Sequence, residues 1–292
     1  MRKSYPLTDS DFDFSHYIFH HSGDRTLPYK HIDGQDIYVS YFHPTTKNTT
    51  PRPTIILIHG GGWSAHKIFP DQNGLWQGDY LGYLARYFAE QGFICVSVDY
   101  RLSREEGQEE HYQLIDCFDD CTCAVDYILD HAQEHGIDPT RVYLLGESAG
   151  GHLAGLLATT YVRPNFHFQS AFLVNGVLNI ADCPTWHKLI PRHSSHPALK
   201  DLTLQERGKY LSPRYRLDCH TCPIILIHGS NDTTVDVSHS QSFYEGMCSL
   251  GLPCDLHIIE KTRHAFLLAE YTDNLPATKI AIAILDAYLK NA

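Results

Sequence analysis

Short runs of aliphatic residues, each followed by turn-forming residues, recur along the chain. Runs of this kind, rich in Ile, Val and Leu, are typical of strands buried on both faces of a parallel sheet. One further segment near the start alternates apolar and polar residues well enough to be a strand. The strands that these patterns predict are 36–42, 54–58, 93–98, 141–145, 169–174, 223–229 and 254–260.

Segments with apolar residues at three- and four-residue spacing lie between these strands, which is the spacing of amphipathic helices. The helices predicted in this way are 78–90, 112–135, 153–160, 238–250 and 277–289. Strands that alternate with helices favour right-handed crossovers between parallel strands. We therefore expect an α/β fold with a mostly parallel central sheet flanked by helices. In such sheets, ligand sites form where loops leave the carboxyl ends of the strands.

Two stretches lack a clear period. Residues 1–35 are polar and rich in aromatic residues, and we expect an irregular lead-in with at most a short helix. Residues 178–220 are rich in prolines, histidines and basic residues, and we interpret them as a small cap or lid inserted in the sheet. With this insertion, the chain 1–292 is expected to form a single domain.

The composition limits the class of protein. Of the 292 residues, 43% are apolar and 20% are charged, the balance of a soluble globular protein with a sizeable core. The formal net charge of −11 argues against nucleic acid and anionic membranes as partners, since both require a basic face. A small neutral substrate is compatible with this charge. The charge does not decide between a monomer and a homo-oligomer.

The start of the chain and its cysteines indicate a compartment. No apolar leader follows Met1, and the longest aliphatic runs, 55–58 and 224–227, are too short to cross a bilayer. We therefore expect the nine cysteines to be mostly free thiols in a reducing cytoplasm. The cysteine clusters 117–123 and 219–222 lack a second pair at zinc-site spacing, so we expect no structural metal.

A Gly-x-Ser-x-Gly pentapeptide at 146–150 lies between a predicted strand and a helix-favouring run. This arrangement is typical of a nucleophile elbow, which holds the serine hydroxyl clear of the main chain in a tight turn. Ser148 would lie at the tip, and Gly146 and Gly150 would avoid a collision of β-carbons across the turn. The alternative is a tight strand-to-helix turn with an incidental serine.

Residues 59–63, His-Gly-Gly-Gly-Trp, directly follow the buried strand 54–58. Consecutive glycines let backbone N–H groups come close to a ligand, although a flexible turn is the alternative. Trp63 would pack beneath this loop or line the acyl pocket. Trp76 and Trp186 are candidates for the wall on the alcohol side, although ordinary packing is the interpretation we favour for both.

A serine nucleophile needs a base that takes its proton and a third group that orients the base. His264 lies in a loop after the last predicted strand and before the final helix, so it is the first candidate for the base. His257 lies on the strand itself and is the weaker candidate, because it would point into a packed layer.

The acid is expected after an earlier strand. Asp232 follows the buried strand 223–229 in a turn-forming segment and is the first candidate. Asp236 is expected to open the next helix as a cap or first-turn acid. Glu260 ends a strand but is too near His264 in the sequence.

Three charged residues beside these motifs are predicted to have structural roles. Glu147, next to the serine, could tune His264 or hydrogen-bond loop amides, and we favour the second role. Asp99 and Arg101 follow a buried strand, and we expect a local ion pair that braces the glycine loop.

Together these motifs resemble the α/β-hydrolase superfamily, and within it the hormone-sensitive-lipase and carboxylesterase-type branch of small bacterial and fungal esterases. The resemblance covers about residues 50–290, and the segments that carry it stand in the family's order: His59-Gly60-Gly61-Gly62-Trp63, Val98-Asp99-Tyr100-Arg101-Leu102, Gly146-Glu147-Ser148-Ala149-Gly150-Gly151, His228-Gly229-x-x-Asp232 and Arg263-His264-Ala265-Phe266. It implies an α/β-hydrolase fold with Ser148 as nucleophile and with Asp232 and His264 as its partners. It also implies an oxyanion hole formed by the amides of Gly61, Gly62 and Ala149.

The expected function is therefore that of a carboxylesterase that cleaves short to medium acyl esters through an acyl-enzyme. Its partner would be a small-molecule ester, and this chemistry needs no cofactor or metal. An arylformamidase or a serine peptidase would use the same three residues. A formamidase like the kynurenine-pathway enzyme usually has a bulky aromatic residue where this chain has Gly62, and a prolyl-oligopeptidase-type peptidase needs a propeller domain. Outside enzymes, the alternative is a hydrolase-fold receptor, which typically lacks one of the three residues.

Overall fold

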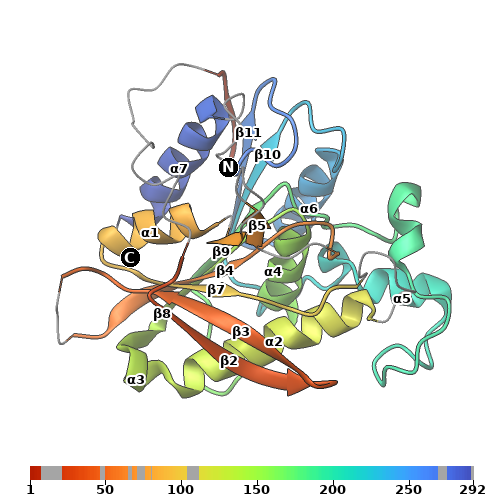
Figure 1. Cartoon of the computed structure of the whole chain (residues 1–292). Coiled ribbons are helices and arrows are strands. Elements are labelled where there is room, and N and C mark those ends of the chain that lie inside the picture. Colours follow the sequence, from red (N-terminus) through yellow and green to blue (C-terminus); the bar gives the residue numbers. More distant parts are fainter. Residues whose placement is uncertain are drawn as a thin grey trace.

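A nine-stranded sheet in the order β1-β11-β10-β9-β8-β4-β7-β3-β2 organises the molecule (Figure 1). The computed structural model describes residues 1–7, 22–46, 50–64, 68–70, 76–79, 81–103, 112–268 and 275–290. From β1 to β7 every neighbouring pair in this sheet is parallel, whereas β3 and β2 are added antiparallel at one edge. The mostly parallel α/β sheet predicted from the sequence is confirmed.

The strands of this sheet are β1 (Arg2–Tyr5), β2 (Arg25–Ile32), β3 (Gln35–Phe42), β4 (Arg52–Ile58), β7 (Ile94–Val98), β8 (Ile137–Glu147), β9 (Ser170–Val174), β10 (Ile224–Gly229) and β11 (Cys254–Ile259). A separate two-stranded ribbon consists of β5 (Ile68–Pro70) and β6 (Trp76–Asp79). The helices are α1 (Gly82–Glu90), α2 (Leu114–Asp130), α3 (Ala132–His135), α4 (Ala149–Thr160), α5 (Leu204–Tyr210), α6 (Ser238–Ser249) and α7 (Leu275–Leu289), with 3₁₀ turns η1 (Pro184–Leu189) and η2 (Pro213–Tyr215). None of the helices in the described ranges is long and apolar enough to cross a membrane.

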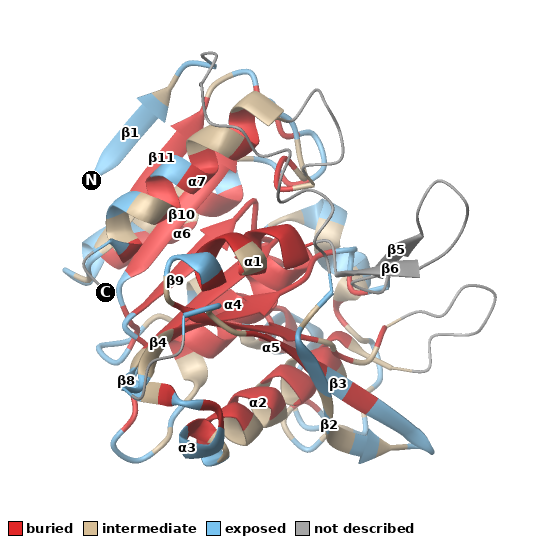
Figure 2. Cartoon of the chain, turned by 60° about the vertical axis from the view of Figure 1, so that its left-hand side comes forward, coloured by how far each residue is buried: buried red, intermediate tan, exposed pale blue. Residues whose placement is uncertain are grey.

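Helices cover both faces of the sheet, so its central strands are buried throughout (Figure 2). Along β4, Ile56 and Ile58 belong to the hydrophobic cluster that includes residues of α2, α4 and α6. The alternate residues Ile55 and Leu57 belong to the cluster formed with α1 and α7. Because both faces of the strand pack against helices, the four residues from Ile55 to Ile58 are all aliphatic, which explains the unbroken run in the sequence.

The carboxyl ends of the parallel strands meet at one edge of the sheet. Ile58 pairs with Gly146 where β4 and β8 end, and Gly229 pairs with Ile259 where β10 and β11 end. The loops that leave these four strands therefore start side by side. Ligand sites of open α/β sheets form at such an edge.

The turn between β8 and α4 has the geometry of a nucleophile elbow. Ser148 has φ 57° and ψ −117°, a strained conformation for a residue with a side chain. A β-carbon on Gly146 would overlap the carbonyl group of Gly150, and one on Gly150 would overlap the carbonyl oxygens of Ile58 and His59. The tight turn therefore requires glycine at both positions, as the sequence motif predicts.

The structure corrects the prediction of an irregular lead-in over residues 1–35, of which 8–21 lie outside the described residues. β1 adds to the sheet beside β11, and β2 forms an antiparallel hairpin with β3. β1 is short and mostly exposed, and a register shift between Pro28 and Lys30 interrupts the pairing of β2. Neither strand therefore shows a regular apolar period.

The predicted helix 112–135 is divided into α2 and α3 at His131. Gly136, with φ 70°, ends α3 in the left-handed conformation expected of a terminal glycine. The other predicted strands and helices are present, with ends shifted by a few residues.

Residues 178–220 lie between β9 and β10 and contain η1, α5 and η2. The guanidinium group of Arg207 is buried in this segment and donates hydrogen bonds to the carbonyl oxygens of Leu199, Pro191 and Arg192 at 3.0, 2.9 and 2.7 Å. One buried side chain thus holds several turns of irregular chain together, so the segment is ordered without an apolar period of its own.

The contact at the elbow generates a prediction about stability. Gly150→Ala should lower the free energy of unfolding by about 3 kcal/mol or more, because the added methyl group meets backbone that cannot move aside. Gly155→Ala, in the same helix, is the matched control, since the nearest atoms to its β-carbon would be in the side chains of Leu178 and Pro213, at 3.1 Å or more. Denaturant unfolding followed by circular dichroism measures both variants. Equal losses in the two would contradict the steric argument.

Candidate active site

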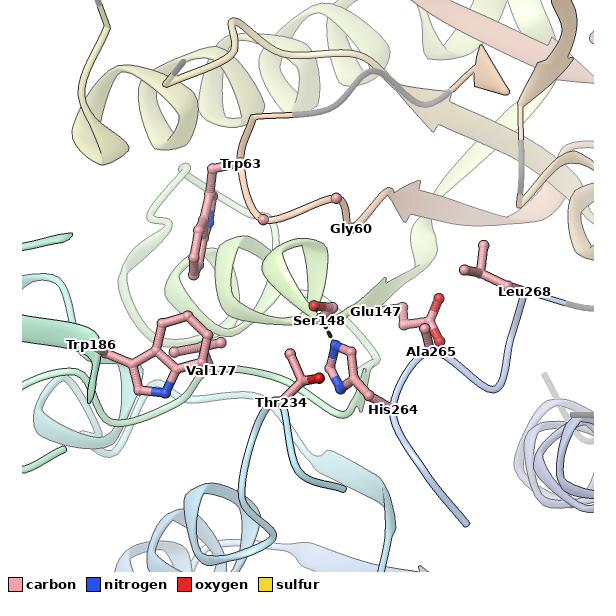
Figure 3. A pocket seen from close by; sticks show the side chains of 12 residues that line it. Gly60, Trp63, Glu147, Ser148, Val177, Trp186, Thr234, His264, Ala265 and Leu268 are labelled. Carbon is pink, nitrogen blue, oxygen red and sulfur yellow. Dashed lines mark hydrogen bonds between the residues drawn. The ribbon is translucent and has the colours of Figure 1, made fainter. Parts of the chain in front are cut away.

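Side chains from three strand ends form a continuous hydrogen-bonded series. The Nε2 atom of His264 lies 2.8 Å from the Oγ atom of Ser148 (Figure 3). The Nδ1 atom of the same imidazole lies 2.6 Å from the Oδ2 atom of Asp232. In the sequence, Ser148 and His264 are 116 positions apart, and Asp232 and His264 are 32 positions apart. The sheet brings the three together because β8, β10 and β11 end at the same edge.

Asp232 is held as a carboxylate by several donors. Its side chain is fully buried, and Oδ1 accepts hydrogen bonds from the backbone N–H groups of Thr234 and Val235 at 2.9 and 2.8 Å. Burial alone would raise the pKa of Asp232, but hydrogen bonds from His228 and His264 and the charge of His264 hold that pKa well below its usual range. The carboxylate can therefore orient the imidazole and stabilise it when it is protonated.

The loop that carries His264 is held in place by hydrogen bonds to its residue Leu267. The buried carboxylate of Glu147 accepts a hydrogen bond from the backbone N–H of Leu267 at 3.0 Å, and the hydroxyl of Tyr83 donates to the carbonyl oxygen of Leu267 at 2.8 Å. Glu147 thus bonds a loop amide, which is the role favoured from the sequence. The backbone N–H and C=O groups of Leu267 are thus both engaged, so the loop approaches Ser148 in a defined position.

The glycine loop turns sharply beside the serine. Gly61, Gly62 and Trp63 have φ values of 95°, 61° and 59°, so three consecutive residues adopt left-handed backbone conformations. The amides of Gly61 and Gly62 donate to no acceptor within the described part of the protein, nor does that of Ala149 at the start of α4. These are the amides that the family resemblance assigns to an oxyanion hole, and Gly61 and Gly62 line the same cavity as Ser148.

Two residues after β7 hold this loop. The hydroxyl of Tyr100 donates to the carbonyl oxygens of His59 and Gly60 at 2.8 and 3.2 Å, and the two rings of Tyr100 and His59 stack 4.2 Å apart. The backbone N–H of Ser103 donates to the carbonyl oxygen of Trp63 at 2.7 Å. The loop is therefore tied down at both ends, which favours a built site over the alternative of a flexible turn.

The predicted ion pair between Asp99 and Arg101 is wrong. Arg101 pairs with Asp120 of α2, with Nε 2.8 Å from Oδ2, and the fully buried Asp120 also contacts Lys30 at 2.5 Å. Asp99 instead lies 3.7 Å from the imidazole of His59. A fully buried carboxylate requires cations around it, so Asp120 takes the guanidinium group.

A cavity of about 230 Å³ opens over Ser148. Its walls are the glycine loop, the elbow and the histidine loop, together with side chains of Trp63, Val177, Trp186, Thr234 and Leu268 (Figure 3). The rings of Trp63 and Trp186 meet almost at a right angle, with centroids 6.1 Å apart.

Trp63 and Trp186, two of the three tryptophan candidates from the sequence, line this cavity, but other lining residues were not predicted. Val177, Thr234 and Leu268 also line the cavity, and the signal available for the first two was their position just after strand ends. The side chain of Trp76, the remaining tryptophan candidate, lies outside the described residues.

The depressed pKa of Asp232 generates a prediction about stability. A carboxyl whose pKa is lower in the folded than in the unfolded state stabilises the fold above its unfolded pKa, near 3.9, and loses that contribution as the pH falls further. Wild type should therefore be more stable than Asp232→Asn at pH 7, and the difference should shrink between about pH 4 and pH 3. Unfolding by urea at several pH values measures this difference. A constant difference from pH 7 to pH 3 would contradict the assigned hydrogen bonds.

Solved structures and relatives resemble this chain over most of its length. The fold is similar to that of a thermophilic esterase, Est2, from the Planctomycetes species Thermogutta terrifontis, with a TM-score of 0.70, 27% identity and 91% of each chain covered. The propionate-bound form of that esterase matches with a TM-score of 0.71 and 26% identity, over 92% of this chain and 94% of the other.

Two relatives in sequence differ in the reactions that their names describe. A probable carboxylic ester hydrolase, LipM, from Mycobacterium tuberculosis is 26% identical over 76% of this chain and 51% of its own length. A kynurenine formamidase from Salmo salar is 23% identical over 85% of this chain and 76% of its own length. The chain thus spans about half the length of LipM.

The family profile of BD-FAE matches residues 36–247, which is more than two thirds of the chain. The matched region runs from β3 to α6 and contains the glycine loop, the elbow and Asp232, so it includes most of the site described above. The chain therefore belongs to the BD-FAE family, and its fold is that of the α/β-hydrolase esterases.

Proposed function

We propose that this protein is a carboxylic ester hydrolase in which Ser148 is the nucleophile, His264 the base and Asp232 the acid. The observation that carries the proposal is the unbroken series from Ser148 Oγ through the His264 imidazole to the Asp232 carboxylate. The names of LipM and of the Thermogutta terrifontis esterase support the same reaction class.

In the first half of the reaction, the hydroxyl oxygen of Ser148 attacks the ester carbonyl carbon while His264 Nε2 accepts the hydroxyl proton. Asp232 stabilises the imidazolium that forms, and it stays unprotonated because its pKa is depressed. The negative oxygen of the tetrahedral intermediate accepts hydrogen bonds from the amides of Gly61, Gly62 and Ala149. His264 then gives its proton to the leaving alcohol, and the acyl group remains on the serine.

In the second half, a water molecule attacks the acyl-enzyme with His264 again as base. The carboxylic acid leaves, and the serine proton is restored. Every step uses side chains and amides of the described chain, and the same amides stabilise both tetrahedral intermediates.

The cavity supports a short to medium acyl group as part of the proposal. A volume of about 230 Å³ with mostly apolar walls accommodates a small apolar acyl chain and its alcohol, with little room for a long lipid. The related esterase has been solved with propionate bound, which is an acyl product of this size.

We assign Trp186 to the alcohol side of the cavity. Trp186 and Thr234 lie on the same side as His264, across from the glycine loop that would hold the oxyanion (Figure 3). Since His264 must reach the leaving oxygen, the alcohol is expected on this side. Residues 178–220, which carry Trp186, would then act as the predicted cap, and Trp63 of the glycine loop would border the acyl group.

An arylformamidase is the second candidate, and the similarity to a kynurenine formamidase favours it. The same three residues would cleave a formamide, with the amine as leaving group. The small Gly62 in the glycine loop is the feature that favours the ester hydrolase.

The nine cysteines form no disulfide bond in the structure, and we include a reducing cytoplasm in the proposal on that basis.

The role of Ser148 is tested by Ser148→Ala. Hydrolysis of nitrophenyl acetate and butyrate should fall at least about ten-thousandfold, and labelling by a fluorophosphonate probe should disappear. Ser249→Ala, at the end of α6, is the control and should be labelled like wild type. Retained activity in Ser148→Ala would refute the nucleophile assignment.

The same preparations distinguish the candidate reactions. Wild type that hydrolyses N-formylkynurenine faster than the esters would favour the formamidase. Wild type that is folded but neither labelled nor active on any of these substrates would favour a hydrolase-fold receptor.

The role of Trp186 is tested by Trp186→Ala. In this variant the ratio of kcat/KM for benzyl acetate to kcat/KM for ethyl acetate should rise about tenfold, because loss of the indole ring makes room for a bulky alcohol group. A series of ethyl esters with acyl chains of increasing length should change much less. Trp186→Phe, which keeps an aromatic wall, is the control. A larger change in the acyl series would place Trp186 on the acyl side instead.

A further inference from the structure

Asp232 lies between two imidazoles, of which the proposed reaction uses only one. Its Oδ2 atom is 2.6 Å from Nδ1 of His264 and 3.3 Å from Nε2 of His228. His228 is on β10, four positions before Asp232, and its side chain is fully buried. Because the buried imidazole of His228 contacts Asp232, the proposed acid of the reaction, we ask how it affects that residue.

The hydrogen bonds of His228 fix which nitrogen carries its proton. Nε2 lies 2.9 Å from the carbonyl oxygen of Val235, and a carbonyl oxygen only accepts, so Nε2 carries the proton. In the neutral ring Nδ1 is then an acceptor, and the hydroxyl of Ser240 donates to it at 2.7 Å. The N–H at Nε2 therefore donates to Val235 and also lies 3.3 Å from the Oδ2 atom of Asp232.

This arrangement closes a small ring of contacts around the carboxylate. The backbone N–H of Val235 donates to Oδ1 of Asp232, and its carbonyl oxygen accepts from His228. His228 thus holds the acid both directly and through the backbone turn that follows it. Rotation of the carboxylate away from His264 would break contacts on both oxygen atoms.

We propose that His228 is a positioning residue for the reaction, which holds the Asp232 carboxylate toward His264 and takes up part of its negative charge. The proposal rests on the ester hydrolase function above. By sharing the charge of Asp232, His228 limits how strongly the acid favours the protonated form of His264. His264 must be neutral to act as base, so His228 sets how far into the acid range the enzyme works.

The other titratable groups near His228 are His239 of α6 and Asp236 before that helix. Burial lowers the pKa of His239 to about 4, with a smaller effect from His228, so His239 is neutral where the enzyme would be active. Asp236 is largely exposed, and its pKa is lowered by hydrogen bonds with Ser238. Neither group changes charge between pH 5 and pH 9, so neither produces the effect tested below.

The test compares His228→Leu with His228→Gln. Leucine removes the donor, whereas the amide nitrogen of glutamine lies near the position of Nε2 and can still donate to Asp232. Without the donor, the carboxylate keeps its full charge for His264, which then stays protonated to a higher pH. The acid limb of kcat/KM for nitrophenyl acetate should move up by roughly half a pH unit, so kcat/KM at pH 6 should fall up to about threefold. His228→Gln should stay close to wild type in both measurements.

An NMR titration of His264 gives a readout without turnover. In the Ser148→Ala background, the titration midpoint of the His264 imidazole should be higher with His228→Leu than with His228 present. If wild type hydrolyses no ester, the function proposed above fails, but this titration still tests the contact.

If the Leu variant does not fold, His228→Asn replaces it, since the shorter side-chain amide of asparagine reaches only the position of Nδ1.

A purely structural role for His228 makes a different prediction. The Leu variant would then be less stable, with an unchanged acid limb and an unchanged His264 titration. That result would overturn the proposal, and so would a His228→Gln variant that behaves like His228→Leu in both titrations.

Discussion

The geometry of the site depends on one steric constraint, the contact of backbone on backbone where α4 begins. The carbonyl oxygens of Ile58 and His59 occupy the place that a side chain on Gly150 would need. The end of β4 and the elbow after β8 are thereby so close that no side chain fits between them at this position. The glycine loop follows the first and Ser148 the second, so the two segments start from neighbouring points that a contact between backbones fixes. The strained backbone of Ser148 is compensated locally, by hydrogen bonds from its N–H to Val174 and from His152 to its carbonyl oxygen.

Electrostatic interactions some distance from the serine also help to position the glycine loop. The carboxylate of Asp120 is fully buried in α2, and it holds Arg101 and Lys30 beside it. Tyr100 directly precedes Arg101 and Ser103 is two positions after it, and these two residues bond the two ends of the glycine loop. Breaking a buried ion pair on one side typically costs about 3–5 kcal/mol, so this segment is strongly held. The amides of the loop are thus positioned by a charge cluster that touches no substrate.

Local signals in the sequence predicted most of the fold and the principal site residues. The runs around Ile55 and Ile225 are aliphatic because both faces of their strands pack against helices, a property visible in the sequence itself. Gly146 is required by contacts within the motif itself, whereas Gly150 is required by the carbonyl oxygens of Ile58 and His59, which the sheet brings close. Arg101 was assigned the wrong partner because Asp120 becomes buried only through tertiary packing of α2, which no local pattern indicates. His228 was overlooked for a similar reason, since a histidine inside a buried strand does not show which group it will meet.

The place of β1 has a consequence for the order in which the chain can fold. β1 is near the start of the chain, yet it pairs with β11, with Arg2 opposite Leu256 and Tyr5 opposite Ile259. The hydroxyl of Tyr5 also bonds His257, more than 250 positions away. During synthesis from the amino end, β11 is made long after β1. β1 can therefore pair only late, and this side of the sheet closes after the strands between the two have been made.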